Sequence, residues 1–227
     1  VVVSGISYLS YLLKRYVFHE SGTLVSGIIG GLYSSTATIS VLARKSRKAS
    51  EQEATDYVAA MLLAVSMMFL RFMILILIFS REIFLSIYPY LLTMAVVAAI
   101  VAWFIHSRQK RPEGQSAETE EDDSSNPLEF KVALIFAVLF VIFTFLTHYT
   151  LVYAGTGGLN LLSFVSGFSD ITPFILNLLQ NTGSVAALII TACSMQAIIS
   201  NIMVNMFYAL FLSLIHISEP TRHAQIS

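Results

Sequence analysis

The chain has 227 residues, of which 56% are hydrophobic and 12% are charged, and its formal net charge is -1 at pH 7. Soluble domains carry about 25% charged residues, so this composition excludes an ordinary soluble protein and predicts a polytopic, all-α membrane protein. The net charge argues against nucleic acid as a partner, and the single cysteine, Cys193, cannot form an internal disulfide.

The two ends of the sequence do not resemble the rest of it. Val1 begins inside an apolar run without a basic leader, which predicts that residues 1–18 are the remainder of a truncated first helix rather than a signal peptide. Near residue 214 the apolar pattern stops and a polar tail without periodicity follows, so residues 214–227 are expected to be a non-native addition. The expected transmembrane domain is therefore residues 1–213.

The second hydrophobic segment, residues 21–43, has a centre of Gly, Ser and Thr rather than Leu and Phe. Glycines weaken a helix, and hydroxyl side chains can satisfy the backbone groups that a broken helix frees in a membrane. The spacing of Gly27 and Gly31 is equally suited to plain close packing of two helices. The hydroxyl side chains are Ser34, Ser35, Thr36 and Thr38. Four basic residues at 44–48 then give the strongest cytoplasmic signal in the chain.

Two long apolar helices are predicted next, over residues 54–79 and 83–105. The first of them contains Arg71 deep in a hydrophobic run. Residues 106–129 form the one long polar segment, which begins with basic residues and continues with acidic ones. This pattern predicts a solvated cytoplasmic loop inside the membrane domain.

Three apolar segments follow, over residues 130–153, 159–179 and 184–213, with a tight turn predicted at 154–158. The middle one repeats the theme of residues 21–43, because placing Gly31 on Gly167 also places Thr36 on Thr172. Ile39 then falls on Ile175, and Leu42 on Leu178. Paired interrupted segments in two halves of a membrane protein indicate a central site. Whether residues 21–43 and 159–179 cross the membrane or re-enter it stays open, so about seven segments are predicted in two pseudo-repeats.

The ionisable residues that lie deep in these segments are Arg71 and Asp170, one of each sign, so an interhelical pair is expected. Its role is either a structural lock or part of a site. The last segment places Ser194, Asn201 and Asn205 on one helical face, as interhelical hydrogen-bonding groups or as a polar wall. The candidate intramembrane site comprises Ser34, Ser35, Thr36, Thr38, Arg71, Asp170, Thr172, Asn201 and Asn205.

Sequence patterns of intramembrane enzymes do not occur in the chain. The Gly-x-Ser-Gly pattern of serine proteases is absent, and residues 167–170, Gly-Phe-Ser-Asp, depart from the Gly-x-Gly-Asp of aspartyl proteases. The apolar segments hold no cluster of His, Asp and Glu, and no nucleotide fingerprint appears. No enzymatic activity, catalytic residue or cofactor is therefore expected, and metal binding is left undecided.

Several stretches in order resemble one known family: SGIIGGLYSSTATISVLARKS at 26–46, MMFLRFMIL at 67–75, NPLEFKVALIF at 126–136, then residues 167–172 and Ser200-Asn201. Together they resemble the uncharacterised C-terminal membrane domain of MgtC/SapB-type bacterial membrane proteins. The family commonly has Asp-Val-Asp-Ala where this chain has residues 170–173, Asp-Ile-Thr-Pro, and Lys where this chain has Asn205. Both departures lower the charge of the candidate site.

The resemblance implies a multi-pass protein of the bacterial inner membrane with an MgtC-like membrane domain upstream, and links it to magnesium by analogy alone. The leading hypothesis is a transporter-like protein in which the interrupted segments line a site for an ion or small solute. The alternative is a non-transporting membrane regulator or assembly partner, in which the same polar residues are structural. The lipid bilayer is the expected surrounding, and a homo-oligomer is compatible with the sequence.

Overall fold

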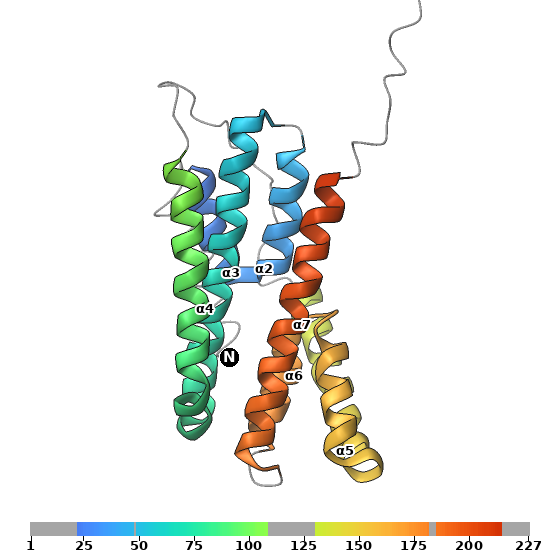
Figure 1. Cartoon of the computed structure of the whole chain (residues 1–227). Coiled ribbons are helices and arrows are strands. Elements are labelled where there is room, and N and C mark those ends of the chain that lie inside the picture. Colours follow the sequence, from blue (N-terminus) through green and yellow to red (C-terminus); the bar gives the residue numbers. More distant parts are fainter. Residues whose placement is uncertain (1–21, 48, 109–129, 182–184, 215–227) are drawn as a thin grey trace, which may run out of the picture.

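The chain forms an all-α bundle without strands in the residues described by the computed structural model, which are 22–47, 49–108, 130–181 and 185–214 (Figure 1). The all-α prediction is therefore confirmed. The expected first helix at 1–18, residues 109–129 of the polar loop and the tail beyond 214 lie outside the described residues.

Two long helices, α3 (Glu51–Phe79) and α4 (Arg81–Ser107), form one side of the bundle. A capping box starts α3, because the Ser50 hydroxyl accepts from the Glu53 amide and the Glu53 carboxylate accepts from the Ser50 amide. Ser80 alone separates the helices and caps α4 by accepting from the Ile83 amide. This turn is shorter than expected, and Ser66 Oγ ties the antiparallel pair together by donating to the Ala95 carbonyl.

The helix α2 (Thr23–Ser46) is broken at Ser34, whose φ of -157° and ψ of 107° are extended. A Cβ on Gly30 would lie 2.5 Å from Thr38 Oγ1. Residues eight apart on a straight helix are separated by about 12 Å along the axis, so the chain must turn back at the break. Both arms of α2 consequently reach the same end of the bundle, at which α3 begins (Figure 1). Residues 23–46 are called the α2 hairpin below.

The helix α5 (Phe130–Ser166) also reverses, at Gly155, whose φ of 58° and ψ of -147° favour glycine. A Cβ on Gly158 would lie 2.7 Å from Thr150 Cγ2, again a contact between residues eight apart. The tight turn predicted at 154–158 is confirmed. After a second break at 167–170, α6 (Ile171–Gln180) returns toward the end at which α7 (Ala187–Leu214) begins (Figure 1). Residues 156–180 are called the α5–α6 hairpin.

The arms of the α5–α6 hairpin have different neighbours. The first arm packs on α7, where Ser200 Oγ donates to the Phe164 carbonyl. The second arm, α6, packs on residues 130–154, where the Phe143 and Phe174 ring centroids are 5.6 Å apart. All of α6 from Ile171 to Leu179 is buried, because protein surrounds this short helix.

Four described helices are long and apolar enough to cross a membrane. They are Glu53–Phe79, Arg81–Ser107, Ala137–Ser166 and Ala187–Leu212. The third of these runs contains the Gly155 reversal, so its crossing part is the portion before that residue. The sequence left open whether residues 21–43 and 159–179 cross the bundle or turn back within it. In the structure both segments belong to hairpins that turn back. Within the described part of the chain, the fold is a helical membrane bundle of four long helices and two hairpins.

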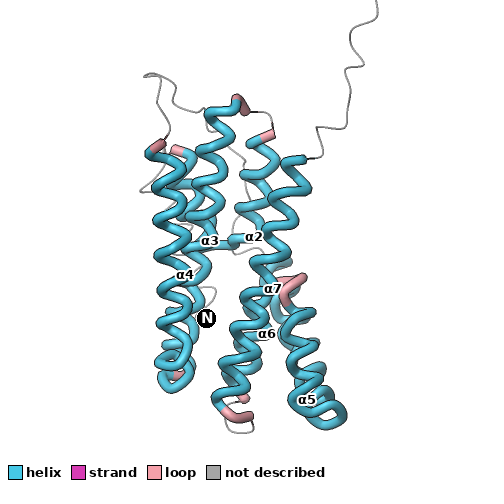
Figure 2. Tube along the Cα trace, in the orientation of Figure 1, coloured by secondary structure: helices cyan, strands magenta, loops and turns pink. Residues whose placement is uncertain are grey.

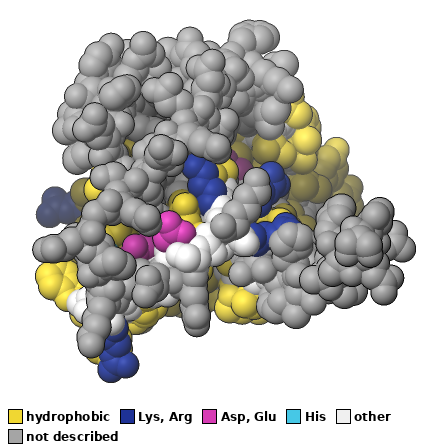
Figure 3. All heavy atoms as spheres, turned by 90° about the horizontal axis from the view of Figure 1, so that it is seen from above, with side chains coloured by type: hydrophobic (Ala, Val, Ile, Leu, Met, Phe, Trp, Pro, Cys, Tyr) yellow, Lys and Arg dark blue, Asp and Glu magenta, His cyan; other side chains and the backbone are white. Residues whose placement is uncertain are grey.

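The outer and end surfaces agree with this arrangement. On α4, Val97 and Trp103 are 59% and 75% exposed, as expected of side chains that face lipid. The end at which α2 joins α3 carries Lys and Arg side chains, viewed from above in Figure 3. This end is called the basic end below. The α2 hairpin starts from the basic end, and the α5–α6 hairpin starts from the opposite end (Figure 1).

Candidate functional site

The two hairpins pack on their long helices in the same register. A Cβ on Gly31 would lie 2.5 Å from Ala64 Cα, so α2 and α3 are in backbone contact there. A Cβ on Gly167 would collide with the Ser200 side chain and lie 2.8 Å from the Asn201 amide nitrogen. Gly167 follows Gly31 by 136 residues, and Ser200 follows Ala64 by the same 136. The offset of 136 residues that relates the two hairpin segments thus also relates the helices on which they pack.

The same offset relates the ends of the elements. Adding 136 to Glu51, the first residue of α3, gives Ala187, the first residue of α7. Adding 136 to Ser34, the break in α2, gives Asp170, the residue that begins α6. Because the hairpins start from opposite ends of the bundle (Figure 1), the two units form an inverted repeat.

Both breaks present the N-terminus of a helical arm inside the bundle. Ser34 Oγ accepts from the Ala37 amide at 3.4 Å, and Asp170 Oδ1 accepts from the Thr172 amide at 2.9 Å. Each side chain thus satisfies one of the amides that a helix start leaves unpaired, and the Asp170 carboxylate also suits the positive end of the dipole. Figure 2 shows the loop before α6 and the bend of α2 near the middle of the bundle rather than at its ends.

The predicted hydroxyl residues of α2 lie at its break. Thr38 Oγ1 donates to the Ser34 carbonyl at 2.8 Å, at the start of the second arm. Ser35 is 8% exposed, whereas Ser34, Thr36 and Thr38 are partly exposed. The counterpart of Thr36 one repeat later, Thr172, is 1% exposed, because α6 is enclosed by other helices. The proposed close packing of Gly27 is also present, since its Cβ would collide with the Ala60 carbonyl.

The polar face of α7 connects to the second break. Asn201 Nδ2 donates to the Gly167 carbonyl at 3.1 Å and approaches the Ser169 carbonyl at 3.4 Å. Asn205 Nδ2 in turn donates to Asn201 Oδ1 at 3.1 Å. Both asparagines are at least 96% buried, and the other end of the chain of bonds, Asn205 Oδ1, has no hydrogen-bond partner. Asn201 thus makes the kind of hydrogen bond expected under the first of its two predicted roles, interhelical bonding.

The prediction that Arg71 and Asp170 form an interhelical pair is wrong. Arg71 is buried at 9% exposure, but Asp170 is exposed and its carboxylate is engaged by the start of α6. No ion pair joins these two side chains, both of which belong to the described residues. The prediction failed because it treated residues 159–179 as one straight helix. The break makes Asp170 a capping residue instead of a mid-helix charge.

Sequence reasoning missed a buried polar residue of α6 itself. Asn177 is 2% exposed, and its Nδ2 donates to Thr144 Oγ1 at 2.8 Å. Asn181 Nδ2 donates to the Asn177 carbonyl at 2.8 Å. The signal that drew attention to Asn201, an asparagine in an apolar helix, would also have found Asn177. Ser194 and Cys193 are buried on α7, with Cys193 Sγ 3.4 Å from Asn160 Oδ1.

Charged groups are sparse within the bundle. His106 Nδ1 and Asp56 Oδ1 lie 2.9 Å apart at the basic end, with both side chains about one-third exposed. No group of three or more His, Cys, Asp and Glu side chains able to hold a metal occurs among the residues that the structure describes. The site chemistry is thus that of helix ends, hydroxyls, amides and one carboxylate.

Comparison with known proteins finds one family over nearly the whole chain. Residues 1–213 match the family described as "Domain of unknown function (DUF4010)". A protein of Aquifex aeolicus (strain VF5) with the printed name "Uncharacterized protein" is 26% identical over 199 residues. That match covers 85% of this chain and 84% of the Aquifex aeolicus protein. No solved structure matches the chain.

Proposed function

The chain belongs to the DUF4010 family. We propose that it is a transporter-like membrane protein for an ion or small solute. The observation that carries the proposal is the inverted repeat, in which two broken hairpins start from opposite ends and turn near the middle of the bundle (Figure 1). Inverted repeats with broken helices characterise many secondary transporters, whose substrates bind where the breaks meet. Two units of opposite orientation also offer two alternative packings of similar free energy, which alternating access requires.

In this proposal the break residues and the polar face of α7 line the site. Ser34 and Asp170 hold the two arm starts, and Asn201 ties the second break to α7. Ser35, Thr36 and Thr38 supply hydroxyls from α2, and Asn205 supplies an amide from α7. Arg71 belongs to the same proposal. Gly31 of α2 contacts Ala64 of α3. One helical turn further along both helices, the α2 break is therefore level with Met68 of α3. Arg71 follows Met68 by three residues, so it lies close to the level of the break.

The test is the accessibility of single cysteines in the protein in membranes, in a Cys193→Ala background. Cysteines replace Ser34, Thr36, Asp170 and Asn201 one at a time. We expect a small, charged, water-soluble thiol reagent to label these positions, and added solutes or ions to slow the labelling. Val97→Cys on the lipid-facing side of α4 is the unlabelled control, and Arg108→Cys at the polar end is the labelled one. A folded protein whose four site cysteines all resist the reagent contradicts a hydrated site.

The second candidate function is a non-transporting membrane regulator or assembly partner. The specific observation in its favour is that several polar groups at the break are already paired within the protein. Ser200 Oγ donates to the Phe164 carbonyl at 2.7 Å, and Asn201 and Asp170 each have backbone partners. Such bonds hold helices together in a membrane without any ligand. Unreactive site cysteines in the experiment above favour this candidate.

The remaining parts of the proposal concern the setting of the protein. We place it in the bacterial inner membrane, supported by the match to a bacterial protein and by the basic end of the bundle. We also propose that the protein is related to MgtC/SapB-type proteins and that an MgtC-like membrane domain lies upstream of it. We further propose that it forms a homo-oligomer and has no enzymatic role. These points depend on the sequence resemblance. Detection of an MgtC-like segment in the same polypeptide from the source organism tests them.

A further inference from the structure

We propose that Asn205 Oδ1 is a ligand for a small monovalent cation bound between the two hairpin breaks. The side chain of Asn205 is 2% exposed, and its Oδ1 is a buried acceptor without a hydrogen-bond partner. An acceptor left unpaired at this depth is costly, so native structures normally pair it with protein, water or an ion. This inference rests on the proposed transporter-like function and names the class of ligand.

The free end of Asn205 is an oxygen because the chain of bonds behind it has a fixed direction. The Gly167 carbonyl can only accept, so the Asn201 group that faces it at 3.1 Å must be the NH₂. Asn201 then presents its oxygen to Asn205, which must donate with its own NH₂ at 3.1 Å. Reversing either amide would put two acceptors or two donors face to face. The chain therefore ends in Oδ1, which requires a hydrogen-bond donor or a cation.

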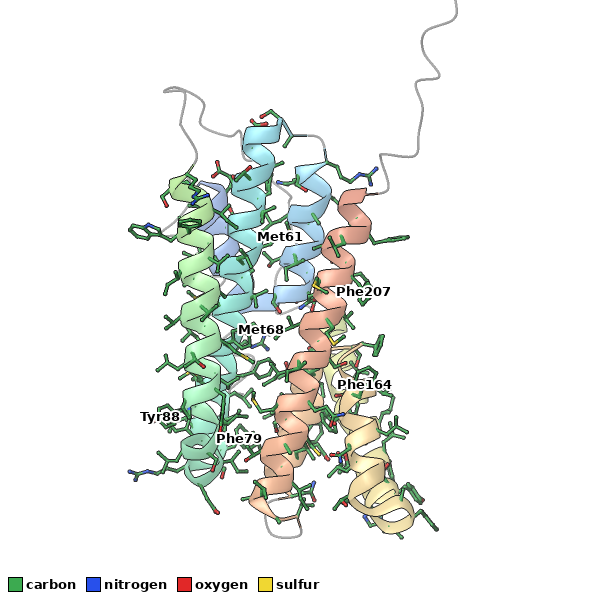
Figure 4. The ribbon with its side chains drawn as sticks, viewed as in Figure 1. Met61, Met68, Phe79, Tyr88, Phe164 and Phe207 are labelled. Atoms are coloured by element: carbon green, nitrogen blue, oxygen red, sulfur yellow. The ribbon has the colours of Figure 1, made fainter. Side chains whose placement is uncertain are left out.

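The position of Asn205 relates it to both breaks. Asn201, one helical turn away on α7, is bonded to the carbonyls of the 167–170 break. The helix α7 also packs against α2. In Figure 4 the labelled Phe207 of α7 lies near the level at which α2 bends. The unpaired oxygen thus lies on the helix that links the two hairpins, in the stretch between their breaks.

Asn205 and the two breaks offer oxygen groups that are mostly neutral. They comprise the Asn205 amide oxygen, hydroxyls at the α2 break and the single carboxylate of Asp170, which adjoins the Ser169 carbonyl bonded by Asn201. Divalent cations such as Mg²⁺ and Ca²⁺ bind hard oxygen sites, commonly with carboxylates. A set dominated by neutral oxygens at a broken helix suits Na⁺ or a similar monovalent cation, as in transporters with unwound helices. The buried Arg71 of α3 lies near the level of the α2 break, and its positive charge opposes a divalent cation more strongly than a monovalent one.

The experiment is thermal unfolding of the purified full chain in detergent, titrated with sodium or potassium chloride against N-methyl-D-glucamine chloride at constant ionic strength. We expect a saturable rise in the unfolding temperature with at least one alkali cation. Asn205→Leu should lower the apparent cation affinity by about tenfold or more, equivalent to ~1.4 kcal/mol. The readout is the cation dependence rather than the unfolding temperature itself, because Asn205→Leu also removes the amide group that donates to Asn201 Oδ1.

Asn177→Leu is the matched control, since Asn177 is equally buried but bonded to Thr144. It should lower the unfolding temperature and leave the cation dependence unchanged. If Asn205→Leu does not fold, Asn205→Ser removes the amide oxygen with a smaller side chain that is still polar, and it should also weaken the cation dependence. A natural chain insensitive to alkali cations, or an Asn205 variant with unchanged cation dependence, overturns the assignment.

The outcomes separate this inference from the proposed function. Labelled site cysteines together with no alkali-cation effect leave a hydrated site and refute the cation. A cation effect that depends on Asn205, together with unlabelled site cysteines, shows a structural ion and refutes transport through the site.

Discussion

Replacing Gly31 by alanine tests the close contact on which the α2 hairpin depends. The added Cβ would lie 2.5 Å from Ala64 Cα and 2.6 Å from the Ala64 carbonyl oxygen, whereas ordinary contacts begin at 3.4 Å. The methyl group is therefore about 0.9 Å too close, the difference between 3.4 and 2.5 Å. Both contacted atoms are backbone, so no side-chain rotation relieves the overlap. The arm of α2 must move away from α3, and we expect this to cost about 1–3 kcal/mol of unfolding free energy.

Gly157→Ala provides the matched control for the same substitution. Gly157 is exposed on α5, and its Cβ would meet no atom within 4 Å. Alanine raises helix propensity by about 1 kcal/mol at either position. The difference in stability between the two variants therefore isolates the steric cost at Gly31.

The assay is equilibrium unfolding in mixed micelles, in which the fraction of sodium dodecyl sulfate is raised and helix content is followed by circular dichroism. Gly31→Ala should unfold at a lower detergent fraction than Gly157→Ala, by an amount equivalent to about 1–3 kcal/mol. Equal stability of the two variants would refute the backbone contact and, with it, the register shared by the two repeats.

Three further predictions concern the breaks. Gly167→Ala should destabilise the protein by about 1–3 kcal/mol in the same assay, and Ser200→Gly should restore part of the loss, because that overlap involves the Ser200 side chain. Gly155→Ala should cost about 1–3 kcal/mol, since φ of 58° with ψ of -147° is strained for a residue with a Cβ; stability equal to Gly157→Ala would contradict the reversal. Asp170→Ala should lose a helix cap worth about 1 kcal/mol, whereas Asp170→Asn should keep the cap. In transport or cation-binding assays, loss of activity in both variants would identify the negative charge of Asp170 as the required property.

Much of the architecture could be predicted from the sequence because hydropathy and turn residues act locally. The long apolar runs gave α3, α4 and α7, and the polar residues between them marked the boundaries. The turn near Gly155 was predicted from its glycines. The interrupted character of the two hairpin segments was likewise visible as Gly, Ser and Thr where a spanning helix would carry Leu and Phe.

The candidate site was predicted in part. Asn201 was expected to bond between helices, and it does so with the Gly167 carbonyl. The Arg71–Asp170 pair was wrong, because a helical wheel assumes a continuous helix and cannot show that Asp170 begins a new one. The unpaired end of Asn205 could not be predicted either, because the direction of its hydrogen bonds depends on a backbone carbonyl of another helix.

The sequence by itself determined that the chain is an all-α membrane bundle and where its helices weaken, since both properties depend on which side chains follow one another. The tertiary structure alone decided that each weak point is a reversal, and that the two reversals start from opposite ends (Figure 1). The direction of a broken helix depends on the surface against which its second arm packs. Here Gly31 on Ala64 and Gly167 on Ser200 are contacts between residues more than 30 positions apart, which no local pattern specifies.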